Sequence, residues 1–219
     1  DCLLSRGLGD VYKRQEYMPS VRSISLGLWF NVGSRDELPN QRGLAHFMEH
    51  MMFKGTPTRT PFDISMHFDR LGAEFNAFTS KEYTCYYARF VDDRLESALE
   101  VLADMVINSS FSTEAISTER EVVLEEIARS EDTPDDYVFE LFNQSMITDH
   151  ALGLPVLGDK RLVSSYEHAD CASFHDQHYG SGNLCIAAAG NIDHDALVKL
   201  TQVYFSSMNT LEKEQRNQD

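Results

Sequence analysis

Two histidines and a glutamate lie within five consecutive residues, at His46, Glu49 and His50. On a helix with about 100° per residue, the two imidazoles lie about 40° apart and one turn along, with Glu49 about 60° to the other side. Imidazoles in this arrangement can bind one metal ion, and a carboxylate beside them can exchange protons with water. The spacing therefore predicts a metal site with an acid–base group within reach.

Apolar residues surround this motif on nearly every side: Leu44, Phe47, Met48, Met51, Met52 and Phe53. A helix that is hydrophobic nearly all round is buried, so its histidines and its glutamate need strong polar partners. A metal ion is one such partner. The alternative is that each histidine donates to a backbone carbonyl and Glu49 caps a nearby group.

A second pair of acidic residues, Glu119 and Glu126, lies in the helix predicted over 113–130. The two project within about 20° of each other, on a face that also carries Ala115, Ile116, Val122, Val123 and Ile127. A catalytic zinc site needs a third protein ligand and an open position. One carboxylate is therefore predicted to be a metal ligand and the other to support it, the alternative being a salt bridge to a neighbouring helix.

The elements that must position these residues alternate between strands and helices, without repeats or low-complexity segments. Apolar alternation predicts strands over 21–32, 73–79, 83–91 and 184–189. Apolar spacing and capping residues predict helices over 44–53, 61–71, 93–108, 113–130, 134–148, 169–178 and 194–205. This order predicts an α+β fold, a mostly antiparallel sheet with helices packed on one face.

The composition limits the partners of the chain. The 19 Lys and Arg against 35 Asp and Glu give a net charge of −16, so we expect no nucleic-acid partner. No apolar run reaches the roughly 20 residues that span a bilayer, so we expect no membrane partner. The four cysteines lack CxxC spacing, which indicates free thiols and slightly favours a cytoplasmic location.

Both ends of the sequence differ in character from its middle. Residues 10–15, DVYKRQ, back-translate into a transposon-end adapter, so 1–15 is expected to be a sequencing artefact, the alternative being an ordinary polar segment. The charged segment 207–219 has no apolar period and is expected to be a linker or a truncation point. The expected domain is 16–206.

Three segments, GLAHFMEHMMFKGT, GAEFNAFTSKEYTCYY and EREVVLEEIARSEDTPDD, resemble landmarks of the pitrilysin or insulinase family of zinc peptidases with the inverted HxxEH motif. They are most similar to the branch of bacterial processing proteases and the mitochondrial processing peptidase β subunit. The resemblance covers about 16–205, the N-terminal half of such a protein. Glu126 follows the motif after 75 intervening residues, as in that branch.

The resemblance implies a role for each of these residues. His46, His50 and Glu126 would bind one Zn²⁺ per chain, Glu49 would be the general base, and Glu119 would be a supporting catalytic carboxylate. A strand would pair its edge with an extended peptide substrate; an ordinary central strand is the alternative. The residues of this predicted substrate strand are Phe75, Asn76, Ala77, Phe78 and Thr79.

The function that this resemblance implies is zinc-dependent endopeptidase activity on extended peptides or presequence-like segments. The enzyme would need a C-terminal homologous domain, which is missing here, and could form a homo- or heterodimer; the fragment alone is expected to be inactive or very weak. The alternatives are a non-catalytic structural or substrate-recognition subunit on the same fold and, more remotely, a zinc-storing or sensor protein. The complete set His46, Glu49, His50 and Glu126 favours the enzyme, because a scaffold has no need of the base.

Overall fold

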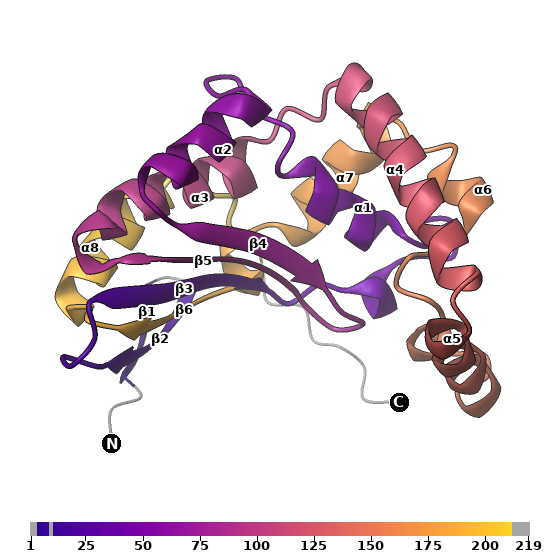
Figure 1. Cartoon of the computed structure of the whole chain (residues 1–219), viewed down its shortest axis with the longest axis horizontal. Coiled ribbons are helices and arrows are strands. Elements are labelled where there is room, and N and C mark those ends of the chain that lie inside the picture. The colour runs from indigo at the N-terminus through magenta and orange to yellow at the C-terminus, as the bar shows by residue number, and fades with distance from the viewer. Residues whose placement is uncertain (1–3, 9–10, 212–219) are drawn as a thin grey trace.

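The computed structural model describes residues 4–8 and 11–211. Its six-stranded sheet has the order β1-β2-β6-β3-β5-β4, and helices lie on one face of it (Figure 1). Every neighbouring pair of strands is antiparallel except β2 and β6, which are parallel. The strands are β1 (Leu4–Leu8), β2 (Val11–Tyr17), β3 (Ser23–Phe30), β4 (Glu74–Thr79), β5 (Thr84–Val91) and β6 (Leu184–Gly190).

Every predicted helix forms, and no end shifts by more than two residues. The helices are α1 (Leu44–Met51), α2 (Pro61–Arg70), α3 (Leu95–Asn108), α4 (Thr113–Glu131), α5 (Pro134–Met146), α6 (Lys160–Val163), α7 (His168–His178) and α8 (His194–Tyr204). The sequence did not predict α6, because a single helical turn is too short to display a period. The architecture confirms the predicted α+β class with a mostly antiparallel sheet.

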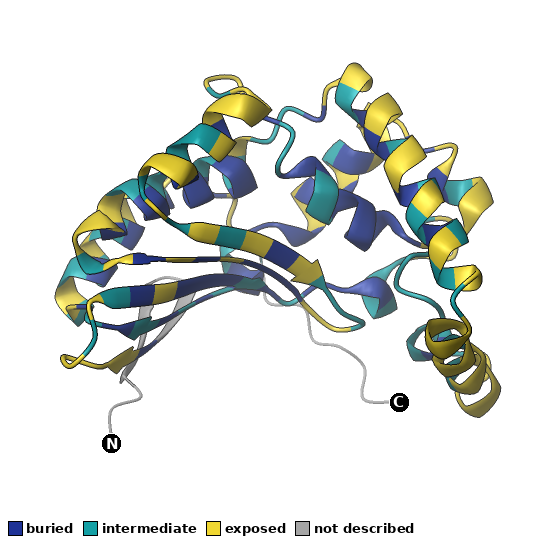
Figure 2. Ribbon diagram, viewed as in Figure 1, coloured by how far each residue is buried: buried dark blue, intermediate teal, exposed yellow. Residues whose placement is uncertain are grey.

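The hydrophobic core lies between the sheet and the helices. Alternate residues of β3, including Leu26, Leu28 and Phe30, point into it and are fully buried. Helix α1 runs through the same layer and is dark along most of its length in Figure 2. The prediction of a buried helix around the HxxEH motif is therefore confirmed.

Strand β4 ends the sheet. It pairs with β5, with Phe75 opposite Ala88 and Ala77 opposite Tyr86, and the sheet order places no described strand on its other side. The alternative of a central strand is therefore wrong. An edge strand has unpaired backbone groups to offer to another chain.

The terminal segments are partly described. Strand β2 includes residues of the suspected artefact 1–15, whose assignment stays a prediction, and residues 1–3 and 9–10 lie outside the described part. In the segment expected to be a linker, Met208 is buried and Asn209 O accepts from Ser181 N at 2.9 Å. Residues 212–219 lie outside the description. In the described part, no helix combines the length and the apolarity needed to span a membrane.

Candidate metal centre

The two histidines of α1 face a carboxylate of α4. His46 and His50 stand one turn apart, with ring centroids 4.8 Å from each other. The Nε2 atom of each lies 3.6 Å from Oε2 of Glu126. All three candidate ligand atoms lie within 4.8 Å of one another. The fold therefore brings the three predicted ligands together from two helices far apart in sequence.

This donor set fits a zinc ion. Zinc bonds of about 2.0–2.2 Å in a tetrahedral site separate ligand atoms by about 3.3–3.5 Å, close to the 3.6 Å between Glu126 and each histidine. The Glu126 side chain is 41% exposed, so solvent reaches the site. Two imidazoles and one carboxylate beside an accessible side form a ligand set found in catalytic zinc sites.

One detail of the predicted face of α4 is wrong. Glu126 was expected in the middle of an apolar face, yet it is half-exposed, and the neighbouring Val122 is exposed. By contrast, Glu119 is 4% exposed. The helical period alone cannot distinguish these two positions. The face of α4 that carries both carboxylates lies against the core at Glu119 and is open to solvent at Glu126.

Burial keeps the His46 imidazole neutral. Desolvation, assisted by the neighbouring His50, lowers the pKa of His46 to about 3 in the metal-free chain. A histidine must be unprotonated to bind a metal. Its other ring nitrogen, Nδ1, is buried and has no hydrogen-bond partner in the described part of the chain.

Glu49 is held by the end of strand β4. Burial raises its pKa above the usual range, whereas hydrogen bonds from the side chain and backbone of Thr79 act in the opposite direction. Its Oε2 is buried without a hydrogen-bond partner among the described residues. This carboxylate therefore has one free oxygen next to the candidate metal ligands and a raised proton affinity, both of which suit a general base.

Glu119 lies behind His50. Its Oε2 is 3.1 Å from Nδ1 of His50, and its Oε1 is 2.7 Å from Nζ of Lys54. Hydrogen bonding at Nδ1 leaves Nε2 as the nitrogen that can bind a metal. Lys54 was not predicted as a site residue, although a lysine in the apolar segment that follows the motif indicates a buried acidic partner.

A cleft of about 500 Å³ opens beside these groups. It is lined by His46, Glu49, His50, Phe53, Lys54, Phe75, Asn76 and Glu126. The cleft is bounded on one side by β4, the predicted substrate strand. Phe75 and Asn76 of that strand line it, so two of the five predicted residues are brought to the site.

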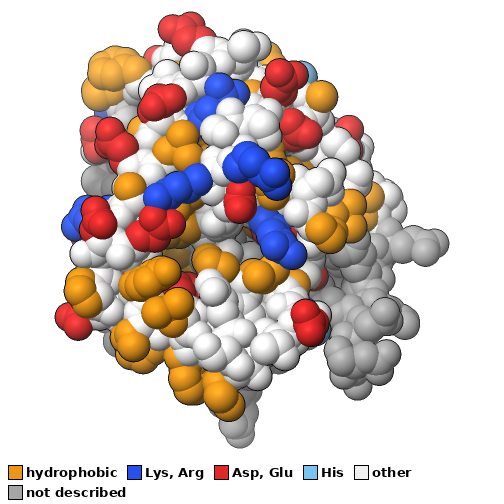
Figure 3. Space-filling model, turned by 90° about the vertical axis from the view of Figure 1, so that its right-hand side faces the viewer, with side chains coloured by type: hydrophobic (Ala, Val, Ile, Leu, Met, Phe, Trp, Pro, Cys, Tyr) orange, Lys and Arg blue, Asp and Glu red, His pale blue; other side chains and the backbone are white. Residues whose placement is uncertain are grey.

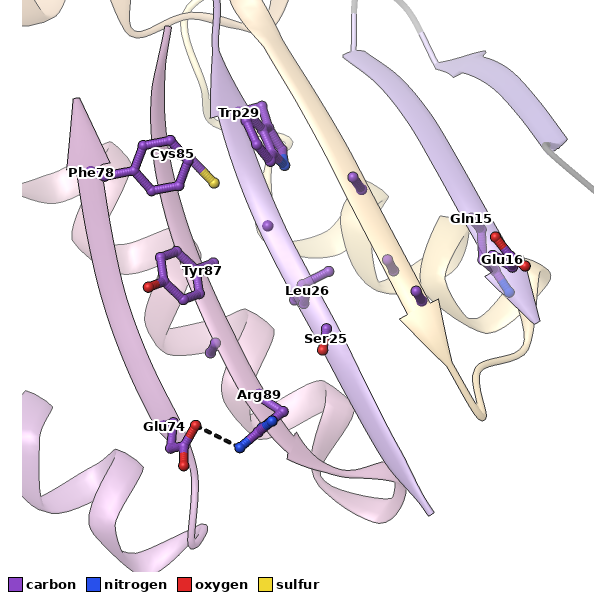
Figure 4. A pocket seen from close by; sticks show the side chains of 15 residues that line it. Gln15, Glu16, Ser25, Leu26, Trp29, Glu74, Phe78, Cys85, Tyr87 and Arg89 are labelled. Atoms are coloured by element: carbon purple, nitrogen blue, oxygen red, sulfur yellow. Dashed lines mark hydrogen bonds and ion pairs between the residues drawn. The ribbon is translucent and has the colours of Figure 1, made fainter. Parts of the chain in front are cut away.

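The other three residues of the predicted strand lie elsewhere. Ala77 is buried, and Thr79 contacts Glu49 rather than the open cleft. Phe78 lies on the opposite face of the sheet, where its ring packs edge-on against Trp29 with centroids 5.7 Å apart (Figure 4). Side chains alternate between the faces of a strand, so five consecutive side chains cannot all line one site.

That opposite face carries a second hollow, of about 670 Å³ (Figure 4). It is lined by Trp29, Phe78, Tyr87 and small residues of β3 and β6, and Arg89 pairs with Glu74 across 2.8 Å at one end. The metal-site residues line the cleft and not this hollow. The candidate chemistry is therefore confined to the cleft.

Comparison with protein families places this geometry in context. A family model described as insulinase (peptidase family M16) matches residues 15–160, and one described as peptidase M16 inactive domain matches residues 165–219. An uncharacterized zinc protease of Mycobacterium leprae is 45% identical over 192 residues, 88% of this chain and 43% of the relative. One of Bacillus subtilis is 42% identical over 192 residues, 88% of this chain and 47% of the relative.

Solved structures share the fold. A protease from Helicobacter pylori superposes with a TM-score of 0.88 at 24% identity, covering 97% of this chain and 52% of that one. The periplasmic protease PqqL from Escherichia coli gives 0.89 at 22% identity, covering 98% and 25%. The chain thus spans less than half the length of the curated relatives above. The match over residues 15–160 and the 45% identity to the curated relative show that the chain belongs to the insulinase family of peptidases, family M16.

Proposed function

We propose that this chain is the metal-binding part of a zinc-dependent endopeptidase with one zinc ion per chain. The observation that carries the proposal is the convergence of His46, His50 and Glu126, with the Glu49 carboxylate beside them in the same cleft. The names of the curated relatives, zinc proteases, agree with it.

Each residue has a distinct task in this proposal. Zinc bound by His46, His50 and Glu126 would acidify a water molecule and polarise the scissile carbonyl. Glu49 accepts the proton of the attacking water on its free oxygen and delivers it to the leaving amine. Thr79 holds that carboxylate in place through its hydroxyl and backbone.

The substrate is proposed to be an extended peptide that adds to the edge of β4. Backbone pairing supplies affinity, and the cleft beside Phe75 and Asn76 accepts side chains next to the scissile bond. The net charge of −16 favours peptides with Arg or Lys near that bond. A cleavage profile without enrichment of basic residues would contradict this preference.

Catalysis is proposed to require a second homologous domain, because the curated relatives are more than twice as long as the matched region. A second domain would form the opposite wall of the cleft and hold the peptide in line for attack. Positioning accounts for several kcal/mol of a catalysed barrier. We also propose that the protein forms a homo- or heterodimer. If this chain cleaves peptides as fast as a longer chain with both domains, the second domain is not required.

The test of the proposed function is Glu49→Gln. The variant should keep about one zinc per chain by elemental analysis and lose peptide hydrolysis, because it loses the base and no ligand. Peptide hydrolysis is measured on a longer chain that has both domains and carries the same substitution. A folded Glu49→Gln protein without zinc would refute the assigned roles. Zinc binding without hydrolysis in the two-domain wild type would instead favour the non-catalytic subunit.

A further inference from the structure

We propose that Lys54 is a positioning residue of the metal site, which acts through Glu119 to set the orientation and tautomer of His50. This inference rests on the proposed zinc site. In the contacts described above, the Lys54 side chain touches none of the three candidate ligands. Its role was not predicted from the sequence.

The Glu119 carboxylate is held at both oxygens. Oε1 lies 2.7 Å from Nζ of Lys54, and Oε2 lies 3.1 Å from Nδ1 of His50. The side chain of Glu119 is 5% exposed, so its carboxylate is largely removed from water. The three groups form a continuous chain from the ammonium through the carboxylate to the imidazole.

Two contacts restrict a carboxylate that one contact would leave free to rotate. The terminal torsion of a glutamate is broad, so a single hydrogen bond leaves the plane of the carboxylate poorly defined. With Lys54 on Oε1, the other oxygen is directed at His50. A fixed acceptor at Nδ1 keeps the proton there and turns Nε2 towards Glu126.

The backbone also restricts where Lys54 can lie. After α1 ends, Phe53 N donates to His50 O at 3.2 Å, and Lys54 N donates to Met51 O at 3.1 Å. Gly55 follows with a φ of +105°, and a Cβ there would come within 2.9 Å of Arg59 O. The backbone hydrogen bonds continue the helical turn as far as Lys54, four residues after His50, so the two side chains start from the same side of α1.

If only charge mattered, removing Lys54 would strengthen metal binding rather than weaken it. An ammonium repels a bound dication, so its loss would strengthen metal binding if repulsion dominated. If orientation through Glu119 dominates, its loss weakens metal binding. The sign of the change in metal affinity therefore distinguishes positioning from simple charge repulsion.

The experiment measures Co²⁺ affinity by absorbance titration of the whole 219-residue chain. Lys54→Met should weaken binding about 3- to 10-fold, less than the 10- to 100-fold typical of residues that contact a ligand directly. Lys54→Arg, which keeps the charge and donors, should restore affinity. In a Glu119→Gln background, Lys54→Met should cause no further loss. Lys160→Met is the matched control, because Lys160 pairs with Glu131 at an exposed position.

A second measurement needs no metal. Nitrogen NMR of the metal-free chain should show His50 protonated at Nδ1 in the wild type and a mixture of tautomers in Lys54→Met. Unchanged or stronger Co²⁺ binding, an unchanged tautomer, or an equal loss in the Glu119→Gln background would overturn the role of Lys54. A wild type that binds no Co²⁺ would overturn the zinc site itself. If Lys54→Met does not fold, Lys54→Gln takes its place in both measurements.

Discussion

The two histidines of the metal site differ in what supports them. His50 is held by Glu119 at Nδ1, whereas Nδ1 of His46 is buried without a hydrogen-bond partner in the described part of the chain. His46 therefore depends on packing in α1 for its orientation. Glu126 and Glu119 also differ, since Glu126 faces both Nε2 atoms and Glu119 only the rear of His50.

This difference predicts unequal effects of two matched substitutions. Glu119→Gln should lower zinc affinity about 10- to 100-fold, as expected when a partner of a ligand is lost. Glu126→Gln should lower it further, because it removes a ligand oxygen. Competition with a chelator of known affinity measures both. Equal losses for the two variants would leave the third ligand unassigned.

At the scale of elements, β4 and the helices α1 and α4 together form the site. Strand β4 contributes Thr79 to the support of Glu49 and leaves its outer edge open. Ser80 N donates to Tyr83 O at the hairpin, so the alternation of an antiparallel ladder turns the N–H of Ala77 outwards. The amide oxygen of Asn76 accepts from that N–H at 2.9 Å.

The open edge predicts an effect of a single proline. Ala77→Pro removes an outward N–H that a peptide carbonyl would take over from the Asn76 side chain, so it should raise the KM for extended peptides while zinc content is retained. Phe78→Pro is the control, because it removes an N–H that faces β5 and should lower the melting temperature more. Peptide kinetics of the two-domain protein and thermal melting measure these effects. An unchanged KM in Ala77→Pro would rule out pairing at this position.

The packing of α7 against α3 predicts a dependence of stability on pH. Nε2 of His175 lies 2.8 Å from Val106 O, and burial lowers the pKa of His175. The unfolded chain binds this proton near pH 6.5 and the folded chain only at lower pH, so stability falls as pH falls below about 6.5. His175→Gln should flatten the pH dependence of the melting temperature between pH 5 and 7. An unchanged slope would show that His175 does not contribute to it.

At the scale of the whole molecule, apolar surface is concentrated on α5. None of its residues is buried, and Phe139 and Phe142 are 68% and 59% exposed. Figure 3 shows hydrophobic side chains gathered low on the face that includes this helix, below a region where acidic and basic side chains are mixed. Apolar patches of this kind promote association between proteins.

We therefore expect the isolated chain to self-associate through α5. Replacing Phe139 and Phe142 with serine should reduce the weight-average mass in sedimentation without lowering the melting temperature, because neither side chain is part of the core. Val203→Ser, on an exposed side of α8, is the matched control. Association that persists in the double variant would point to another surface.

Local spacing was sufficient to predict part of the site. His46, Glu49 and His50 lie on one helix, so their relative placement follows from the helical period alone. The same period identified Glu119 and Glu126 as neighbours on α4, and apolar alternation predicted β3, β4, β5 and β6. These features depend on residues close in sequence, where backbone geometry leaves few choices.

The tertiary structure decided what depends on distant residues. His50 and Glu119 are 69 positions apart, and only the packing of α1 against α4 determined that Glu119 supports the histidine while Glu126 faces the cleft. Alternation along β4 predicted two faces, but the position of the helices decided that Phe78 points away from the site. The contact of Lys54 with Glu119 likewise depends on two helices meeting. Periodicity within one element cannot specify the distance or orientation between elements, which arises from burial of their apolar faces against each other.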